Sequence, residues 1–147
     1  MGIRILLADD HTIVLQGLCR FLREQEGMEV VGQAKDGLSV VELARELVPD
    51  IIIMDISMPG LSGVEATRRI HAENPDIKII GLSMHVAKRY VQEMYKAGAR
   101  GYLLKDCDFD ELIAAVQAVA AGGTYFADEF GDIISQTASR SGPAARP

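Results

Sequence analysis

The sequence predicts an α/β protein of the doubly wound kind, in which helices cover both faces of a parallel sheet. Two observations predict it. Short apolar runs alternate with longer amphipathic segments, and this unit recurs five times along 147 residues. Strands separated by helices pair in parallel through right-handed crossovers. The chain is 48% hydrophobic, which is enough at this length to bury the core of one domain.

The first two strand-helix units occupy the N-terminal third of the chain. Their strands are the apolar runs Ile3–Ala8 and Met28–Ala34. The first helix, His11–Glu24, is predicted from five apolar residues at helical spacing, which are Ile13, Val14, Leu18, Phe21 and Leu22. The second helix, Gly37–Leu47, repeats this spacing, and Pro49 stops it.

The other three units follow with short connections. Ile51–Asp55 is a continuous apolar run that ends on a carboxylate, and such a run is typical of a strand buried on both faces. The last two strands are predicted at Ile77–Ser83 and Gly101–Leu104. The helices are predicted at Gly63–Ala72, Ala87–Ala97 and Phe109–Ala121. They are ended by Asn74-Pro75, by Gly98 and by Gly122-Gly123.

Five such units favour a flavodoxin-like (βα)5 sheet with the strand order 2-1-3-4-5, in a three-layer α/β/α arrangement. We expect this domain to span residues 1–124. Residues 125–147 are expected to form a short helix around Asp128–Gln136 and a flexible linker, because the end of the chain is small, polar and contains proline.

Composition and charge exclude several classes of protein. The net charge of −6 argues against nucleic-acid binding by this chain itself. Cys19 and Cys107 lack the spacing of a zinc site or a disulfide framework, and we expect both to be reduced thiols. No apolar run is long enough for a signal peptide or a membrane span. The sequence therefore predicts a soluble, cytoplasmic protein with no membrane partner.

Four of the five predicted strands end on a polar or charged side chain. The first is followed by Asp9 and Asp10, the third ends on Asp55, the fourth ends on Ser83, and Lys105 follows the fifth. The carboxyl ends of parallel strands share one edge, and ligands bind where the strand order switches, here between strands one and three. We therefore expect the three carboxylates to converge there, with the serine and the lysine on the other flank.

Three crowded carboxylates repel one another unless a cation joins them. An all-oxygen ligand set suits Mg²⁺ or Mn²⁺ and not zinc. One carboxylate can then act as a nucleophile and form an aspartyl phosphate, and we expect it to be Asp55 because it lies centrally. Lys105 and Ser83 are residues of the types that hold the oxygens of a transferring phosphoryl group.

Each of these residues has a plain structural explanation when it is taken alone. The acidic pair could cap a helix, Asp55 could be a solvated strand end, Ser83 could cap the next helix, and Lys105 could be a surface charge. Their joint occurrence at one edge of the sheet favours a phosphoryl-transfer site.

The motifs resemble those of response-regulator receiver domains, in the branch that precedes a LuxR-type (NarL/FixJ) helix-turn-helix. The matching segments cover Ile3 to Phe126 and are LLADDH, VPDIIIMDISMPGLSGVEA, IIGLSMH, AGARGYLLKD and ELIAAVQAVAAGGTYF. The resemblance implies a two-component signalling domain. It catalyses only its own phosphorylation and dephosphorylation and is not otherwise an enzyme.

The resemblance also implies individual roles. Asp55 accepts phosphate from a phosphohistidine on a sensor histidine kinase, and Asp10 and Asp55 ligate Mg²⁺. Asp9 binds the metal mostly through water, and the backbone carbonyl of Ser57 completes the site. Ser83 and Lys105 hold the phosphoryl oxygens. Tyr102 is the switch aromatic, which turns inward on activation.

The same family implies an output. Phosphorylation would drive a conformational change, with a homodimer as one result, and would control transcription through a DNA-binding domain that this chain lacks. Either the chain is a truncated piece or it is a natural single-domain receiver, and the linker-like tail favours truncation. The cognate kinase, the stimulus and the target genes cannot be read from the sequence.

Two residues are hypotheses for control of phosphoryl lifetime. Ser57 and His85 lie two positions beyond Asp55 and Ser83, so they would border the phosphoryl group and position or exclude water. The alternative for His85 is a solvent-facing loop imidazole. His11 has a weaker claim and is expected to open the first helix, and His71 is expected on an exposed helix side.

Two other functions are consistent with an α/β fold of this kind. One is a phosphohydrolase of the haloacid dehalogenase type, but such enzymes carry a DxD motif after strand one, and here that position holds an adjacent acidic pair. The other is a flavin-binding domain, which needs a phosphate-cradling loop after strand one. The acidic ADDHTIV segment would repel the phosphate of FMN.

Overall fold

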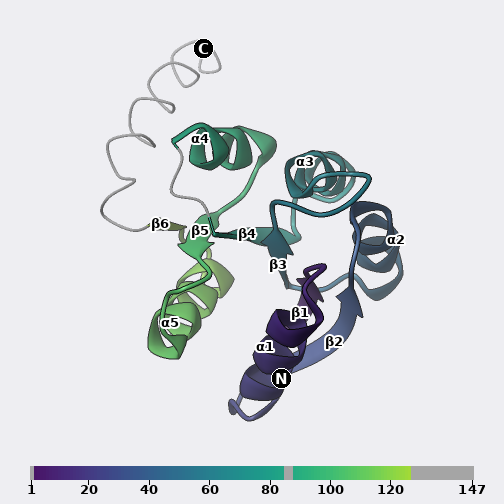
Figure 1. The fold of residues 1–147 in the computed structure, drawn as a ribbon. Coiled ribbons are helices and arrows are strands. Elements are labelled where there is room, and N and C mark those ends of the chain that lie inside the picture. Colours follow the sequence, from purple (N-terminus) through teal and green to yellow (C-terminus); the bar gives the residue numbers. More distant parts are fainter. Residues whose placement is uncertain (1, 85–87, 127–147) are drawn as a thin grey trace.

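The computed structural model describes residues 2–84 and 88–126 and shows one parallel sheet wrapped by helices (Figure 1). Six strands lie in the order β2-β1-β3-β4-β5-β6. Their bounds are β1 Ile3–Ala8, β2 Met28–Ala34, β3 Ile51–Asp55, β4 Lys78–Ser83, β5 Gly101–Leu104 and β6 Tyr125–Phe126. The five described helices are α1 Thr12–Arg23, α2 Gly37–Leu47, α3 Gly63–Glu73, α4 Lys88–Ala97 and α5 Phe109–Ala120.

The helices form two layers, as the sequence predicted. Helices α1 and α5 cover one face of the sheet, and α2, α3 and α4 cover the other (Figure 1). Each face has its own apolar core. On the α1/α5 side the core includes Leu15, Leu22 and Leu112, and on the other side it includes Val40 and Ile70. The predicted flavodoxin-like topology with the order 2-1-3-4-5 is confirmed, with one further strand at the end.

The sixth strand is the element that the sequence prediction missed. Tyr125 and Phe126 pair in parallel with Gly101 and Tyr102 of β5, and the Tyr125 amide donates to the Arg100 carbonyl at 2.9 Å. Two residues are too few to show an alternating pattern, and the contacts that hold this strand, with the edge of β5, with Glu111 and with Tyr95, all come from residues distant in sequence. The helix expected around residues 128–136 lies outside the described residues.

Strand β3 is buried along its whole length, which explains the unbroken apolar run that ends in Asp55. All five of its residues are buried, and β1 and β4 flank it on both sides. The loop that follows folds tightly back over the strand end. A Cβ atom built on Gly63 would lie 2.1 Å from the Asp55 carbonyl oxygen, so only glycine fits at this start of α3.

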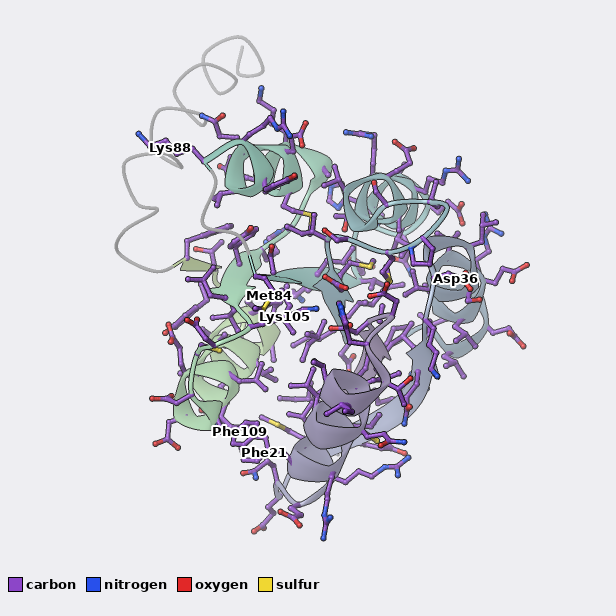
Figure 2. The ribbon with its side chains drawn as sticks, viewed as in Figure 1. Phe21, Asp36, Met84, Lys88, Lys105 and Phe109 are labelled. Carbon is purple, nitrogen blue, oxygen red and sulfur yellow. The ribbon has the colours of Figure 1, made fainter. Side chains whose placement is uncertain are left out.

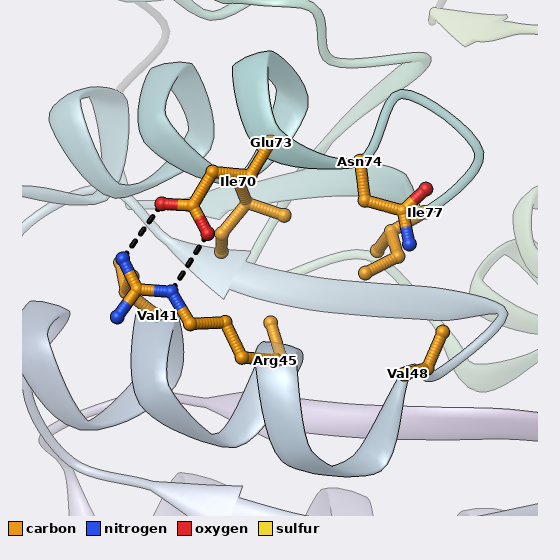
Figure 3. A pocket seen from close by; sticks show the side chains of 8 residues that line it. Val41, Arg45, Val48, Ile70, Glu73, Asn74 and Ile77 are labelled. Carbon is orange, nitrogen blue, oxygen red and sulfur yellow. Dashed lines mark hydrogen bonds and ion pairs between the residues drawn. The ribbon is translucent and has the colours of Figure 1, made fainter.

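Helices α2 and α3 pack side by side and line a small cavity of about 170 Å³, to which none of the predicted site residues contributes (Figure 3). Arg45 of α2 and Glu73 of α3 form a two-pronged ion pair beside it, with both N···O distances at 2.7 Å. No helix within residues 2–84 and 88–126 has the length and apolar character to cross a membrane.

We expect the Arg45–Glu73 pair to contribute little to stability. Both side chains are exposed, and exposed ion pairs lose in side-chain entropy and salt screening most of what they gain. Arg45→Ala should leave the urea midpoint of unfolding nearly unchanged at physiological salt. A large fall in that midpoint would show that the pair, and not the apolar contacts behind it, holds α2 against α3.

Candidate functional site

Four of the predicted site residues meet at the carboxyl edge of the sheet. The backbone places them, because two of these residues extend the strand ladders by one hydrogen bond each. The Asp9 amide donates to the Ala34 carbonyl at 3.0 Å, and the Lys105 amide donates to the Ser83 carbonyl at 2.8 Å. Asp55 is the last residue of the central strand β3, between them.

A lysine joins the two most buried carboxylates. The Lys105 Nζ atom lies 2.9 Å from the Asp9 Oδ2 and 3.3 Å from the Asp55 Oδ2. The three side chains are only 6%, 2% and 3% exposed, respectively. In Figure 2, Lys105 lies beside Met84, where β4 and β5 end. The ammonium therefore partly compensates two buried negative charges, which would otherwise be strongly unfavourable.

The compensation is incomplete at two oxygen atoms. The buried Oδ2 atoms of Asp9 and Asp55 are within ion-pair distance of the lysine, yet neither receives a well-oriented hydrogen bond from the described residues. Buried polar atoms normally have such a partner, and an unpartnered carboxylate oxygen in a pocket is a place for a bound cation. Asp10 is one-third exposed and completes the acidic group.

His11 belongs to this cluster, which the sequence prediction did not assign. Its Nδ1 lies 3.0 Å from the Asp9 Oδ1, 3.2 Å from the Asp10 Oδ1 and 3.2 Å from the Lys105 Nζ. It also precedes α1 as the N-cap residue, as expected, but its side chain makes no capping hydrogen bond. The feature of the sequence that could have placed His11 in the cluster is its position directly after Asp9 and Asp10, at a strand end. One ligand atom from each of Asp9, Asp10, His11 and Asp55 falls within 4.8 Å of the others.

Ser57 lies in the loop after β3 and is exposed. Its backbone amide donates to the Asp55 Oδ1 at 3.2 Å, which fixes the carboxylate relative to the loop. The adjacent backbone is held in turn, because the Gly63 amide donates to the Ile56 carbonyl at 2.8 Å. His85 lies outside the described residues. His71 is half-buried on α3, where its ring packs against Gly98, away from this site.

Ser83 and Tyr102 are joined to each other behind the carboxylates. Ser83 is 1% exposed, Tyr102 is fully buried, and their side chains share a hydrogen bond. Burial raises the pKa of the Tyr102 hydroxyl, and the hydrogen bond with Ser83 offsets part of that rise. The tyrosine ring therefore lies inward, against the sheet, with its hydroxyl at the strand-end edge.

Burial and the charge of Asp9 raise the pKa of the Asp55 carboxyl from 3.8 to about 6, and the Lys105 ammonium pulls it back only in part. The folded protein thus binds more protons than the unfolded chain between these two values. The free energy of unfolding should therefore fall as pH rises from 4 to 6, by on the order of 2 kcal/mol, and then level off. Urea unfolding across this range, with chelator present, measures the effect.

The matched control for this pH dependence is Asp55→Asn, which cannot titrate. Subtracting its stability profile from that of the wild type isolates the contribution of Asp55 from those of the other carboxyl groups. If the two profiles run parallel from pH 4 to 7, the pKa of Asp55 is not raised in the folded protein.

A doubly wound domain that gathers buried aspartates, a lysine and a serine at its carboxyl edge has the architecture of a receiver. The sequence model of the response regulator receiver domain matches residues 5–117. The chain belongs to this family, whose members act in two-component signal transduction. This replaces the phosphohydrolase and flavin alternatives.

Individual relatives agree with this assignment. The chain is 46% identical to the transcriptional regulatory protein DegU of Brevibacillus brevis over 84% of this chain and 52% of that protein. It is 40% identical to the response regulator UvrY of Escherichia coli K12 over 92% of this chain and 61% of that protein. The chain therefore spans just over half the length of these two regulators.

Solved structures give the same result. A LuxR-family two-component response regulator from Aurantimonas superposes with a TM-score of 0.85 at 35% identity, covering 92% of this chain and 97% of that one. The isolated REC domain of RcsB from Salmonella enterica serovar Typhimurium, solved in the presence of phosphomimetic BeF3−, superposes with a TM-score of 0.80 at 26% identity. That match covers 93% of this chain and 99% of the other.

Proposed function

We propose that Asp55 is the phosphoacceptor of this receiver and that a sensor histidine kinase is the donor. The observation that carries the proposal is the buried Asp9–Lys105–Asp55 contact at the switch point of the sheet. The lysine side chain is almost wholly buried between these two carboxylates, at the edge of the sheet where ligands bind in folds of this kind. Such a contact is typical of a site that handles a phosphoryl group.

The proposed reaction transfers a phosphoryl group from a phosphohistidine. A carboxylate oxygen of Asp55 forms the new P–O bond, the P–N bond to the kinase imidazole breaks, and that nitrogen keeps the electron pair and takes up a proton. Lys105 is placed to neutralise one phosphoryl oxygen. The Ser83 hydroxyl would exchange its contact with Tyr102 for another of these oxygens.

The residues present fit a divalent cation of the magnesium type. The donor set is mostly carboxylate oxygen, and two of those oxygens lack a hydrogen bond. Asp10, Asp55 and the Ser57 carbonyl would hold Mg²⁺ or Mn²⁺, with Asp9 acting mostly through water. When bound, the cation supplies charge neutralisation to the acidic group and to the phosphoryl oxygens.

The proposal also covers the conformational switch and the lifetime of the phosphoryl group on Asp55. Tyr102 is the switch aromatic, and its inward position is the signalling arrangement. Movement of Ser83 toward the phosphoryl group would end its contact with the Tyr102 hydroxyl and vacate space beside β4 for the ring. Ser57 and His85 are proposed to tune dephosphorylation by positioning or excluding water. The role of Ser57 is proposed because its backbone amide contacts the Asp55 carboxylate, so that Ser57 lies next to the expected phosphoryl group.

We also propose a domain division, a location and an output for this receiver. The receiver extends to Phe126 and not only to the expected residue 124, because β6 joins its sheet, and the linker lies within the rest of the chain. The domain acts in the cytoplasm, where its two free cysteines stay reduced, and it catalyses only reactions at its own aspartate. Phosphorylation promotes a homodimer. Output reaches DNA through a LuxR-type domain, in keeping with the description of DegU as a transcriptional regulator.

The test is incubation of the purified chain with acetyl phosphate, followed by intact mass measurement. We expect an adduct of one phosphoryl group when Mg²⁺ is present and none when it is replaced by a chelator. If the folded wild-type protein gains no adduct with Mg²⁺ at any donor concentration, and beryllofluoride does not bind either, then Asp55 is not a phosphoacceptor.

A further inference from the structure

Strand β4 carries a glycine near its centre, between two large apolar residues. Gly81 is buried and lies between Ile80 and Leu82. Glycine in a buried strand fills no core volume and loses more backbone entropy on folding than any other residue. An interior strand glycine therefore often marks a place where another group approaches closely.

The group that approaches is the ring of Tyr102. Gly81 and Tyr102 are direct partners in the register between β4 and β5. A Cβ atom built on Gly81 would lie 3.3 Å from the Tyr102 Cδ2 and 2.9 Å from the Met94 Cε of α4. The space that a side chain at position 81 would need is thus already taken by the inward tyrosine and by one methionine.

The geometry of a strand links Gly81 to Ser83 as well. Residues two apart in a strand face the same side of the sheet, so position 81 and the Ser83 side chain lie on one face. The Tyr102 ring passes over Gly81, and its hydroxyl shares a hydrogen bond with Ser83. Gly81 therefore forms the floor on which the ring rests between β4 and α4.

Met94 of α4 shares with the Tyr102 ring the space above Gly81. Met94 is fully buried, and its Sδ atom accepts a hydrogen bond of 3.8 Å from the Thr67 hydroxyl of α3. The Met94 methyl group is the end of a flexible chain and can shift. The Tyr102 ring cannot bend in this way, so any part of a side chain at position 81 that the Met94 methyl group does not accommodate must displace the whole ring.

We propose that Gly81 is a positioning residue for the switch: the absence of a side chain there is what allows Tyr102 to occupy its inward place. This rests on the proposed function, in which inward Tyr102 is the signalling arrangement. A side chain at position 81 would drive the ring outward and make the receiver respond more weakly to a phosphoryl group on Asp55.

The first readout follows the ring itself and needs neither metal nor phosphate. The protein has four tyrosines, and fluorotyrosine labelling gives each a fluorine resonance, with Tyr102 assigned through Tyr102→Phe. In the wild type we expect the Tyr102 resonance to show almost no solvent isotope shift between H2O and D2O. Gly81→Ala should increase that shift, and Gly81→Val should bring it close to that of free fluorotyrosine.

Gly32→Ala is the matched control. Gly32 also lies in a strand, and its built Cβ would meet two flexible side chains, Leu47 Cδ1 at 2.8 Å and Leu6 Cδ1 at 3.2 Å. The crowding is like that at Gly81, but Tyr102 is not involved. This variant should lose stability without moving the Tyr102 resonance. If Gly81→Val does not fold, the solvent isotope shift of the Tyr102 resonance in Gly81→Ala tests the same displacement with a smaller expected increase.

The second readout measures the response to a phosphoryl analogue. Gly81→Ala should weaken the binding of beryllofluoride with Mg²⁺ by about tenfold, an effect in the range expected for overpacking. In a Tyr102→Ala background the same substitution should change binding little, because the ring on which it acts is gone. An unchanged Tyr102 resonance in folded Gly81→Val overturns the inference. Absence of beryllofluoride binding by the wild type would instead overturn the proposed function.

Discussion

Replacing Asp55 by asparagine should abolish the phosphoryl adduct and stabilise the metal-free protein at neutral pH. The amide oxygen is too weak a nucleophile to form the acyl phosphate. The same change removes a carboxylate that is disfavoured first by its burial and then by the charge of Asp9, which together raise the Asp55 pKa to about 6. Intact mass after acetyl phosphate treatment measures the first effect, and urea unfolding in chelator measures the second.

Asp50→Asn is the matched control for this experiment. Asp50 lies directly before β3, at the end opposite to Asp55, and its Oδ2 accepts the Arg4 amide at 2.8 Å. The substitution has the same chemistry and should leave phosphorylation unchanged. A phosphoryl adduct that persists in full on Asp55→Asn would place the phosphoacceptor elsewhere in the chain. A metal-free protein that becomes less stable would show that Asp55 is held by favourable contacts instead of repulsion.

The second large effect is expected from Lys105→Met. Methionine keeps the apolar stem and removes the only lysine ammonium within reach of the Asp9 and Asp55 carboxylates in the described residues. Breaking a buried ion pair by removing one partner destabilises by about 3–5 kcal/mol. We therefore expect a loss on the order of 3 kcal/mol without metal, and phosphorylation by acetyl phosphate slowed about a hundredfold with Mg²⁺.

Addition of Mg²⁺ separates the two roles of the lysine. The cation can neutralise the carboxylates, so it should restore much of the lost stability, while the slow phosphorylation persists because one phosphoryl oxygen has lost its partner. Lys35→Met is the control, since the Lys35 ammonium is exposed and donates a hydrogen bond to the Thr12 hydroxyl at 3.0 Å. Normal phosphorylation rates in Lys105→Met would remove this lysine from the reaction.

The fold could be predicted from the sequence because its signals are local. The apolar run of β3 and the helical spacing in α1 each depend on residues close together in the chain, and the predicted bounds agree with the observed ones within two residues. The strand order followed from right-handed crossovers. The meeting of Asp9, Asp55, Ser83 and Lys105 at one edge followed from that order, because parallel strands end on the same side.

The tertiary structure decided what depends on residues distant in sequence. It placed the His11 imidazole 3.2 Å from the Lys105 Nζ, set the two-residue strand β6 against β5, and put the Tyr102 ring over Gly81. None of these has a periodic signal. A pattern in the sequence tells which face of an element is buried, whereas the position of one side chain is set by whichever atoms of other elements already fill the space around it.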